Sequence, residues 1–130
     1  MKYNDVAENP KREVIEKWVA ALESGEYEQA TGVLRRFEDF DGRKAGFCCL
    51  GVLCDLAVKE GVITETILPE RSYAEYGEHF DDVELPDAVV SWAGLSSTCP
   101  WIGGRSLVSM NDVDRRSFAE IAEHIRASLL

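Results

Sequence analysis

Three cysteines stand in one apolar stretch of the sequence, FCCLGVLCDLA at residues 47–57, and metal binding is the first chemistry that they suggest. A helix turns by about 100° per residue, so Cys48 and Cys49 each point roughly 120–140° away from Cys54. Thiolates spread in this way cannot hold one ion from one face of a helix, and neither histidine of the chain stands in a zinc-binding spacing. We therefore expect no metal ion.

Nucleophilic catalysis is the other chemistry open to these thiols. Cys48 or Cys49 would stand near the start of a helix, which lowers a thiol pKa, but a reactive thiolate also needs a base. The residues around His79 and His124 do not mark either histidine as that base. We interpret the cysteines as small apolar core residues, expect a protein without catalysis or cofactor, and keep a cysteine-dependent enzyme as the least favoured hypothesis.

Gly51 and Asp55 lie on the side of the same predicted helix that the leucines leave uncovered. A glycine within a helix costs about 1 kcal/mol relative to alanine, and a close approach by another backbone or by a ligand would explain its presence. Asp55 either accepts hydrogen bonds from that ligand or faces water. Both residues therefore enter the candidate ligand-binding set.

A second segment, CPWIGGRSLVSMND at residues 99–112, has the composition of a small anion site. Gly103 and Gly104 can offer backbone N–H groups, and Arg105 beside them carries a guanidinium. The segment is not a P-loop, because the spaced glycine and the lysine are missing, and an ordinary glycine turn is the alternative. An anion site here would favour a ligand with a phosphate group.

Other residues of this region can complete such a site. Trp101 follows a proline in the glycine-rich segment and can stack on a planar ligand, while asparagine and aspartate side chains can read its polar edges. Arg115 and Arg116 precede a predicted helix, whose start favours an anion. The candidate ligand-binding residues are therefore Gly51, Asp55, Trp101, Gly103, Gly104, Arg105, Ser106, Asn111 and Asp112.

The elements that must position these residues follow from apolar spacing and end signals. They predict an α+β fold, a small single domain over residues 1–130 that is dominated by helices. The helices are expected at about 10–24, after Asn9-Pro10, and at 47–60, 86–93 and 117–129, the last from a capping box at Ser117 and Glu120. One or two short β-hairpins are expected, around Asp41-Gly42 and within 62–80, and residues 96–106 are predicted to be a loop.

Charge and composition narrow the choice of partners. The chain of 130 residues has a net charge of −10, and residues 61–100 hold eight acidic side chains against one basic. A protein this acidic lacks the clustered Lys and Arg of a duplex nucleic-acid binder. No apolar run is long enough to cross a membrane, and the N-terminal residues show no signal segment, so we expect a cytoplasmic protein with reduced thiols.

Four segments of the chain occur in a familiar order: FCCLGVLCDLA at 47–57, LPDAVVSWAGL at 85–95, SLVSMND at 106–112 and SFAEIAEHI at 117–125. They resemble motifs of a widespread family of short, uncharacterised bacteriophage proteins, which have the forms CCLGVLCDL, LPxxVxxWxGL and SLxxLND followed by SFxEIAxxI. Met110 replaces the usual leucine of the third motif. The resemblance implies a phage-type protein in the host cytoplasm and carries over no catalytic residue.

Two binding functions follow from these observations. The favoured hypothesis is a non-catalytic accessory protein that sequesters a small phosphate-containing ligand, such as a nucleotide immune signal of host anti-phage defence. The alternative is a protein-interaction module whose acidic 65–87 surface occupies a basic site on a host protein. A homodimer is a further expectation, because sequestering proteins can build a pocket between two subunits.

Overall fold

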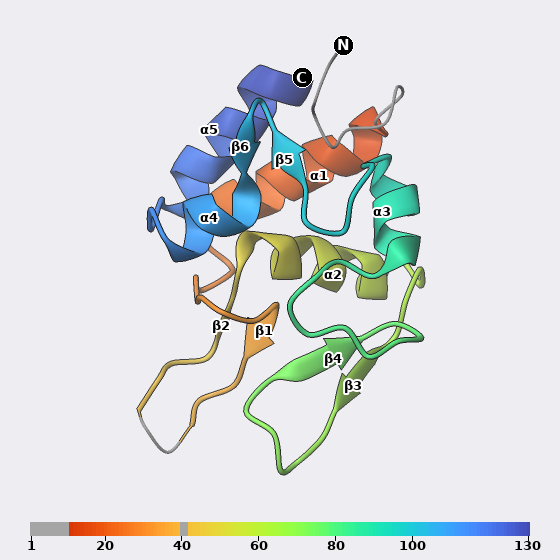
Figure 1. Ribbon diagram of the computed structural model, residues 1–130, viewed down its shortest axis with the longest axis vertical. Coiled ribbons are helices and arrows are strands. Elements are labelled where there is room, and N and C mark those ends of the chain that lie inside the picture. Colours follow the sequence, from red (N-terminus) through yellow and green to blue (C-terminus); the bar gives the residue numbers. More distant parts are fainter. Residues whose placement is uncertain (1–10, 40–41) are drawn as a thin grey trace.

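Five helices and three short antiparallel hairpins make up the described part of the chain, residues 11–39 and 42–130 of a computed structural model (Figure 1). The helices are α1 (Arg12–Glu23), α2 (Cys49–Lys59), α3 (Asp87–Ala93), α4 (Leu107–Asp112) and α5 (Phe118–Leu129). The strands pair as β1 (Arg35–Arg36) with β2 (Gly46–Phe47), β3 (Glu65–Ile67) with β4 (Ala74–Tyr76), and β5 (Trp101–Ile102) with β6 (Arg105–Ser106). This is the helix-dominated α+β fold that the sequence predicts.

The predicted helices are present, each within two residues of its expected bounds. α1 buries one face, formed by Val14, Ile15, Trp18, Val19 and Leu22. Its predicted start signal, Asn9-Pro10, lies outside the described residues. At α5 the Ser117 hydroxyl accepts from the Glu120 N–H and the Glu120 carboxylate accepts from the Ser117 N–H, which confirms the capping box.

The hairpin expected around Asp41-Gly42 is represented by the antiparallel pair of β1 and β2, although Asp41 itself lies outside the described residues. A third hairpin differs from the prediction. Residues 101–106, expected within a loop, form the β5–β6 hairpin around Gly103 and Gly104, whose φ angles are +57° and +77°. Two consecutive left-handed residues give the turn that matches the twist of a tight hairpin.

α2 runs through the middle of the molecule (Figure 1). α1, α4 and α5 lie to one side of it, and the hairpins β1–β2 and β3–β4 lie to the other side. The Trp18 indole N–H donates to the Cys49 carbonyl at 2.9 Å, which joins α1 to the first turn of α2. Among the described residues, no helix has the length and apolar character needed to cross a membrane.

Gly51 explains how α2 can be covered on the side that the leucines leave. A Cβ atom at this position would lie 1.7 Å from the Leu34 carbonyl oxygen, so the backbone that leads into β1 packs directly on the helix. The Leu34 carbonyl also accepts from the Cys48 N–H at 3.1 Å. The close approach predicted from the glycine is therefore made by another part of the backbone.

We predict that Gly51→Ala destabilises the protein by about 3 kcal/mol or more, because the added methyl forces the segment at Leu34 away from α2. Urea unfolding followed by circular dichroism measures this difference. Val58→Ala, in the same helix but only partly buried, is the control and is expected to cost about 1 kcal/mol. Equal stability of Gly51→Ala and the wild type would contradict the packing described here.

Candidate functional site

The residues predicted to bind a ligand do not meet in one cavity. Asn111 lies in the interior with 1% of its surface exposed, and its side-chain amide is fully used within the protein. Its Oδ1 accepts from the Cys49 N–H at 3.2 Å and from Gln29 Nε2 at 2.9 Å. Its Nδ2 donates to the Ala30 carbonyl and to Asp112 Oδ1, both at 2.8 Å. Asn111, with Asp112 beside it, therefore joins α4 to the start of α2 and to the segment around Gln29 and Ala30.

Asp55 lies in the second half of α2, and its contacts are with Tyr27 and Lys59. It accepts from the Tyr27 hydroxyl and forms an ion pair with Lys59 Nζ at 3.1 Å. Burial and the bond to this carboxylate raise the pKa of Tyr27. Asp55 joins α2 to the segment that follows α1, and these partners satisfy it.

The β5–β6 hairpin separates two of the predicted residues. Trp101 pairs with Ser106 and Ile102 pairs with Arg105, and paired residues of an antiparallel hairpin share a face. Trp101 and Arg105 therefore lie on opposite faces, so the indole cannot stack on a ligand held by that guanidinium. Ser106 caps α4 by accepting from the Ser109 N–H at 3.2 Å.

Three of the four cysteines lie in the protein core. Cys48, Cys49 and Cys54 are buried, and Cys99 is partly exposed. Burial raises the pKa of Cys48 to about 12 and raises the pKa values of Cys49 and Cys54 well above the ordinary value. Over residues 11–39 and 42–130, no group of His, Cys, Asp or Glu side chains is arranged to hold a metal ion.

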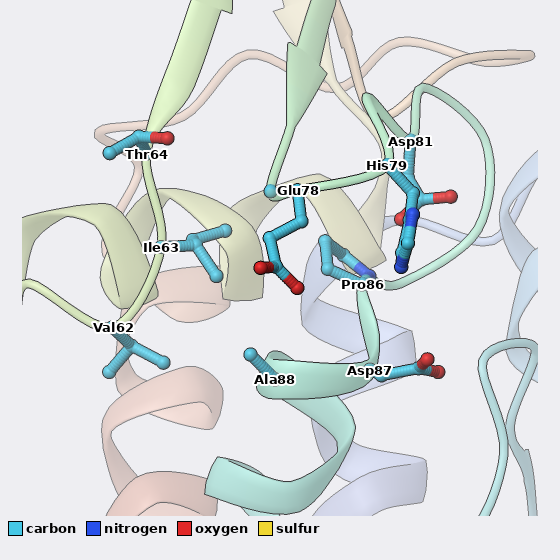
Figure 2. A pocket seen from close by; sticks show the side chains of 10 residues that line it. Val62, Ile63, Thr64, Glu78, His79, Asp81, Pro86, Asp87 and Ala88 are labelled. Atoms are coloured by element: carbon cyan, nitrogen blue, oxygen red, sulfur yellow. The ribbon is translucent and has the colours of Figure 1, made fainter.

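A hollow of about 400 Å³ opens where α2 ends and α3 begins, and we call it the acidic groove (Figure 2). Its lining comes from three segments: residues 62–64 after α2, residues 77–79 and 81 after β4, and residues 86–88 at the start of α3. The sequence showed the excess of acidic residues in this region but gave no sign of a cavity, because the hollow exists only once the three segments fold against one another.

Local backbone contacts fix the shape of the acidic groove. The Gly77 N–H donates to the Thr64 carbonyl at 3.0 Å, which ties the turn after β4 to the segment after α2. Gly77 has a φ of +77°, and a Cβ there would lie 3.1 Å from Pro86 Cβ. A glycine therefore allows this turn to pack against the start of α3.

The β3–β4 hairpin beside the groove is held by a partly buried ion pair. Arg35 Nη1 donates to both carboxylate oxygens of Glu65, at 2.9 and 3.0 Å, and the Tyr76 hydroxyl donates to the same carboxylate at 2.7 Å. The guanidinium also lies over the rings of Phe37 and Phe47, at 4.9 and 5.0 Å. These contacts attach the hairpin to β1–β2 and hold one wall of the groove in place.

The carboxylates of the acidic groove are not engaged in ion pairs with lysine or arginine residues of the described part of the chain. Among the residues that the structure describes, no ion pair engages Glu78, Asp81 or Asp87, and Figure 2 shows the Glu78 carboxylate reaching between Ile63, Pro86 and Ala88. The groove thus combines an apolar floor with carboxylates that remain able to pair.

The surroundings of Asp81 disfavour the ionised form of its carboxyl group. Burial raises the pKa of its carboxyl, the neighbouring His79 lowers it, and the charges of Asp87, Glu84 and Asp82 raise it further. A raised carboxyl pKa means that the ionised form is disfavoured in the folded protein. A cation placed in the groove would stabilise the ionised Asp81 carboxylate and offset the like charges of Asp87, Glu84 and Asp82.

The comparisons with known proteins identify a family and no function. A family model described as a domain of unknown function (DUF8296) matches residues 10–129. No curated protein and no solved structure matches the chain.

We predict that Cys48, Cys49 and Cys54 resist modification by a disulfide reagent such as Ellman's reagent at pH 8 in the native protein. Their burial and raised pKa values leave little accessible thiolate. Mass spectrometry of labelled peptides, with and without urea, should locate the native-state label on Cys99 and find the other three only after unfolding. Rapid native labelling of Cys48 or Cys49 would instead support a reactive thiol.

We further predict that Asp81→Asn raises the free energy of unfolding at pH 7. The wild-type carboxyl has a folded-state pKa above its unfolded value, so its ionised form opposes folding at pH 7. The advantage of the variant should disappear as the pH falls through the raised pKa, because both states then carry the proton. Urea unfolding at pH 7 and pH 3 tests this, with Glu26→Gln as the control for a distant charge; a less stable Asp81→Asn at pH 7 would contradict it.

Proposed function

The chain belongs to the DUF8296 family, and we propose that it is a non-catalytic binding protein that docks a basic segment of a partner protein in the acidic groove. The observation that carries this proposal is that Glu78, Asp81 and Asp87 all belong to the lining of one hollow, and that no ion pair among the described residues engages them. The proposal is related to the alternative in which the acidic 65–87 surface occupies a basic site on a host protein, but here the partner contributes a segment that enters the groove.

The chemistry of the groove suits a lysine or arginine side chain. Such side chains pack their alkyl stems on apolar surface and keep the charged head in contact with polar groups. Ile63, Pro86 and Ala88 provide the apolar surface, and the Glu78 carboxylate lies above it (Figure 2). A volume of about 400 Å³ is large enough for the side chains of a short segment and small for a whole helix.

Phe80 is an exposed aromatic residue between His79 and Asp81, two residues that line the groove. Its surface is 56% exposed, and its φ angle is +55°, in the left-handed region that bulky residues rarely occupy. Aromatic side chains are enriched among the residues that dominate protein interfaces. An exposed aromatic residue that directly precedes Asp81 in the chain supports a protein partner over a free cation.

The resemblance to bacteriophage proteins suggests the setting in which such docking would act. We propose a phage-type accessory protein in the host cytoplasm whose partner is a host protein with a basic surface. The acidic character of residues 61–100 opposes binding to duplex nucleic acid. The expected homodimer stays a prediction, and sequestration of a phosphate-containing ligand would have to use fewer residues than the sequence suggested.

We predict that the triple variant Glu78→Gln, Asp81→Asn, Asp87→Asn binds a lysine-rich peptide at least about tenfold more weakly than the wild type. Fluorescence anisotropy with a labelled Ala-Lys-Lys-Ala-Lys-Lys-Ala peptide at physiological salt measures the affinity. A control variant, Glu13→Gln, Glu26→Gln, Glu28→Gln, removes the same charge outside the groove and is expected to change the affinity less than about twofold.

The control decides between docking and general attraction. An equal loss of affinity in both triple variants would mean that the peptide responds only to the net charge of the protein and not to the groove, and the proposal would fail. Phe80→Ala tests the apolar contact separately, with a peptide in which one alanine is replaced by leucine. Amide chemical shifts of the wild type should change in residues 62–64 and 77–88 on peptide addition.

A further inference from the structure

A second hollow, of about 490 Å³, lies between the β5–β6 hairpin, α4 and α5. Arg105 reaches it from β6, Arg116 from the residues before α5, and His124 from within α5. The floor includes the side chains of Met110 and Ala119. We propose that this hollow binds a small molecule in which a phosphate group is attached to an apolar or aromatic body. The site shares no residue with the acidic groove.

Within the described part of the chain, each of the two arginines of the hollow has one long ion-pair contact. Arg105 Nη2 lies 3.6 Å from Asp114 and Arg116 Nη1 lies 3.4 Å from Glu120, with guanidinium-bearing side chains that are 45% and 42% exposed. Arg126, by contrast, donates from both terminal nitrogens to the two Glu23 oxygens. Exposed single contacts of this kind contribute about 0–1 kcal/mol, so a phosphate can compete for the remaining donors.

The two carboxylates that line the hollow, Glu120 and Glu123, also contact groups other than Arg105 and Arg116. Glu120 Oε1 accepts from the Ser117 backbone N–H and hydroxyl, which leaves only Oε2 for Arg116. Glu123 lies 3.4 Å from Arg126 Nη1. Neither carboxylate therefore cancels the donors of the hollow completely.

His124 gives the hollow a ring of fixed orientation. Its Nε2 lies 2.6 Å from the Ile102 carbonyl, and because a carbonyl only accepts, this nitrogen carries the proton. A Cβ at Gly103 would lie 2.4 Å from Ser128 Oγ and 3.1 Å from His124 Cε1, so the glycine lets the hairpin turn pack on α5. Gly103 therefore contributes to the hollow by allowing close packing of the hairpin turn against α5, and not by binding the ligand.

The arginines and the apolar residues that line the hollow together indicate the class of ligand. Guanidinium groups on the rim suit a phosphate, whereas Met110, Ala119 and Ala127 offer apolar surface that inorganic phosphate would not use. A nucleoside monophosphate has both parts and is of suitable size. AMP is therefore the probe of choice, with adenosine and inorganic phosphate as its two halves.

Isothermal titration of the full chain with AMP, adenosine and inorganic phosphate tests the proposal. We expect saturable AMP binding, with adenosine and phosphate each at least about tenfold weaker. The double variant Arg105→Gln, Arg116→Gln should reduce AMP affinity to that of adenosine. Arg12→Gln, Lys17→Gln removes the same charge on α1 and should leave AMP binding unchanged.

A steric variant keeps the test independent of charge. Ala119 is exposed in the first turn of α5, so Ala119→Phe should fold and fill the hollow, and we expect it to weaken AMP binding at least about tenfold. Unchanged AMP binding in this variant, or equal loss in the α1 control, would overturn the proposal. Equal binding of inorganic phosphate to the wild type and the double arginine variant would show an adventitious ion only.

Discussion

The buried amide of Asn111 is the interaction on which the arrangement of the helices depends. It connects the end of α4 to the first N–H of α2, through Cys49, and to the backbone at Ala30. Gln29, which donates to Asn111 Oδ1, also donates to the Arg116 carbonyl at 2.8 Å and accepts from the Phe118 N–H at 3.1 Å. Two side-chain amides thus join α2, α4 and α5, and a polar network satisfied in this way specifies one arrangement of its elements.

This network determines where binding can occur. It closes the N-terminal end of α2, and the backbone at Leu34 covers Gly51, so the helix side that the sequence left open is filled by protein. Surfaces for other molecules are therefore peripheral. The acidic groove lies at the far end of α2 and the second hollow lies outside α4 and α5, and Figure 1 shows α3 and α5 on opposite sides of the molecule.

The sequence could predict the parts of the structure that depend on local signals. Apolar spacing and the Ser117 capping box located the long helices, and the composition of 62–80 located the β3–β4 hairpin. α4 was missed because six residues are too few to show a helical period. The role of Asn111 was missed because Gln29 and Cys49 are 82 and 62 positions away, and no local pattern reports such pairing. The groove was missed because three short segments within residues 62–88 enclose it together, and no single segment has a pattern that reports a hollow.

The distribution of arginine partners supports binding as the purpose of the acidic residues. Arg35 and Arg126 each form two-point contacts with a carboxylate, and those pairs connect elements of the fold. Within residues 11–39 and 42–130, no ion pair engages Glu78 or Asp87, and Asp81 has a raised pKa through burial and like charges. The ionised Asp81 carboxylate therefore opposes folding, which agrees with our proposal that another molecule supplies a cation to the groove.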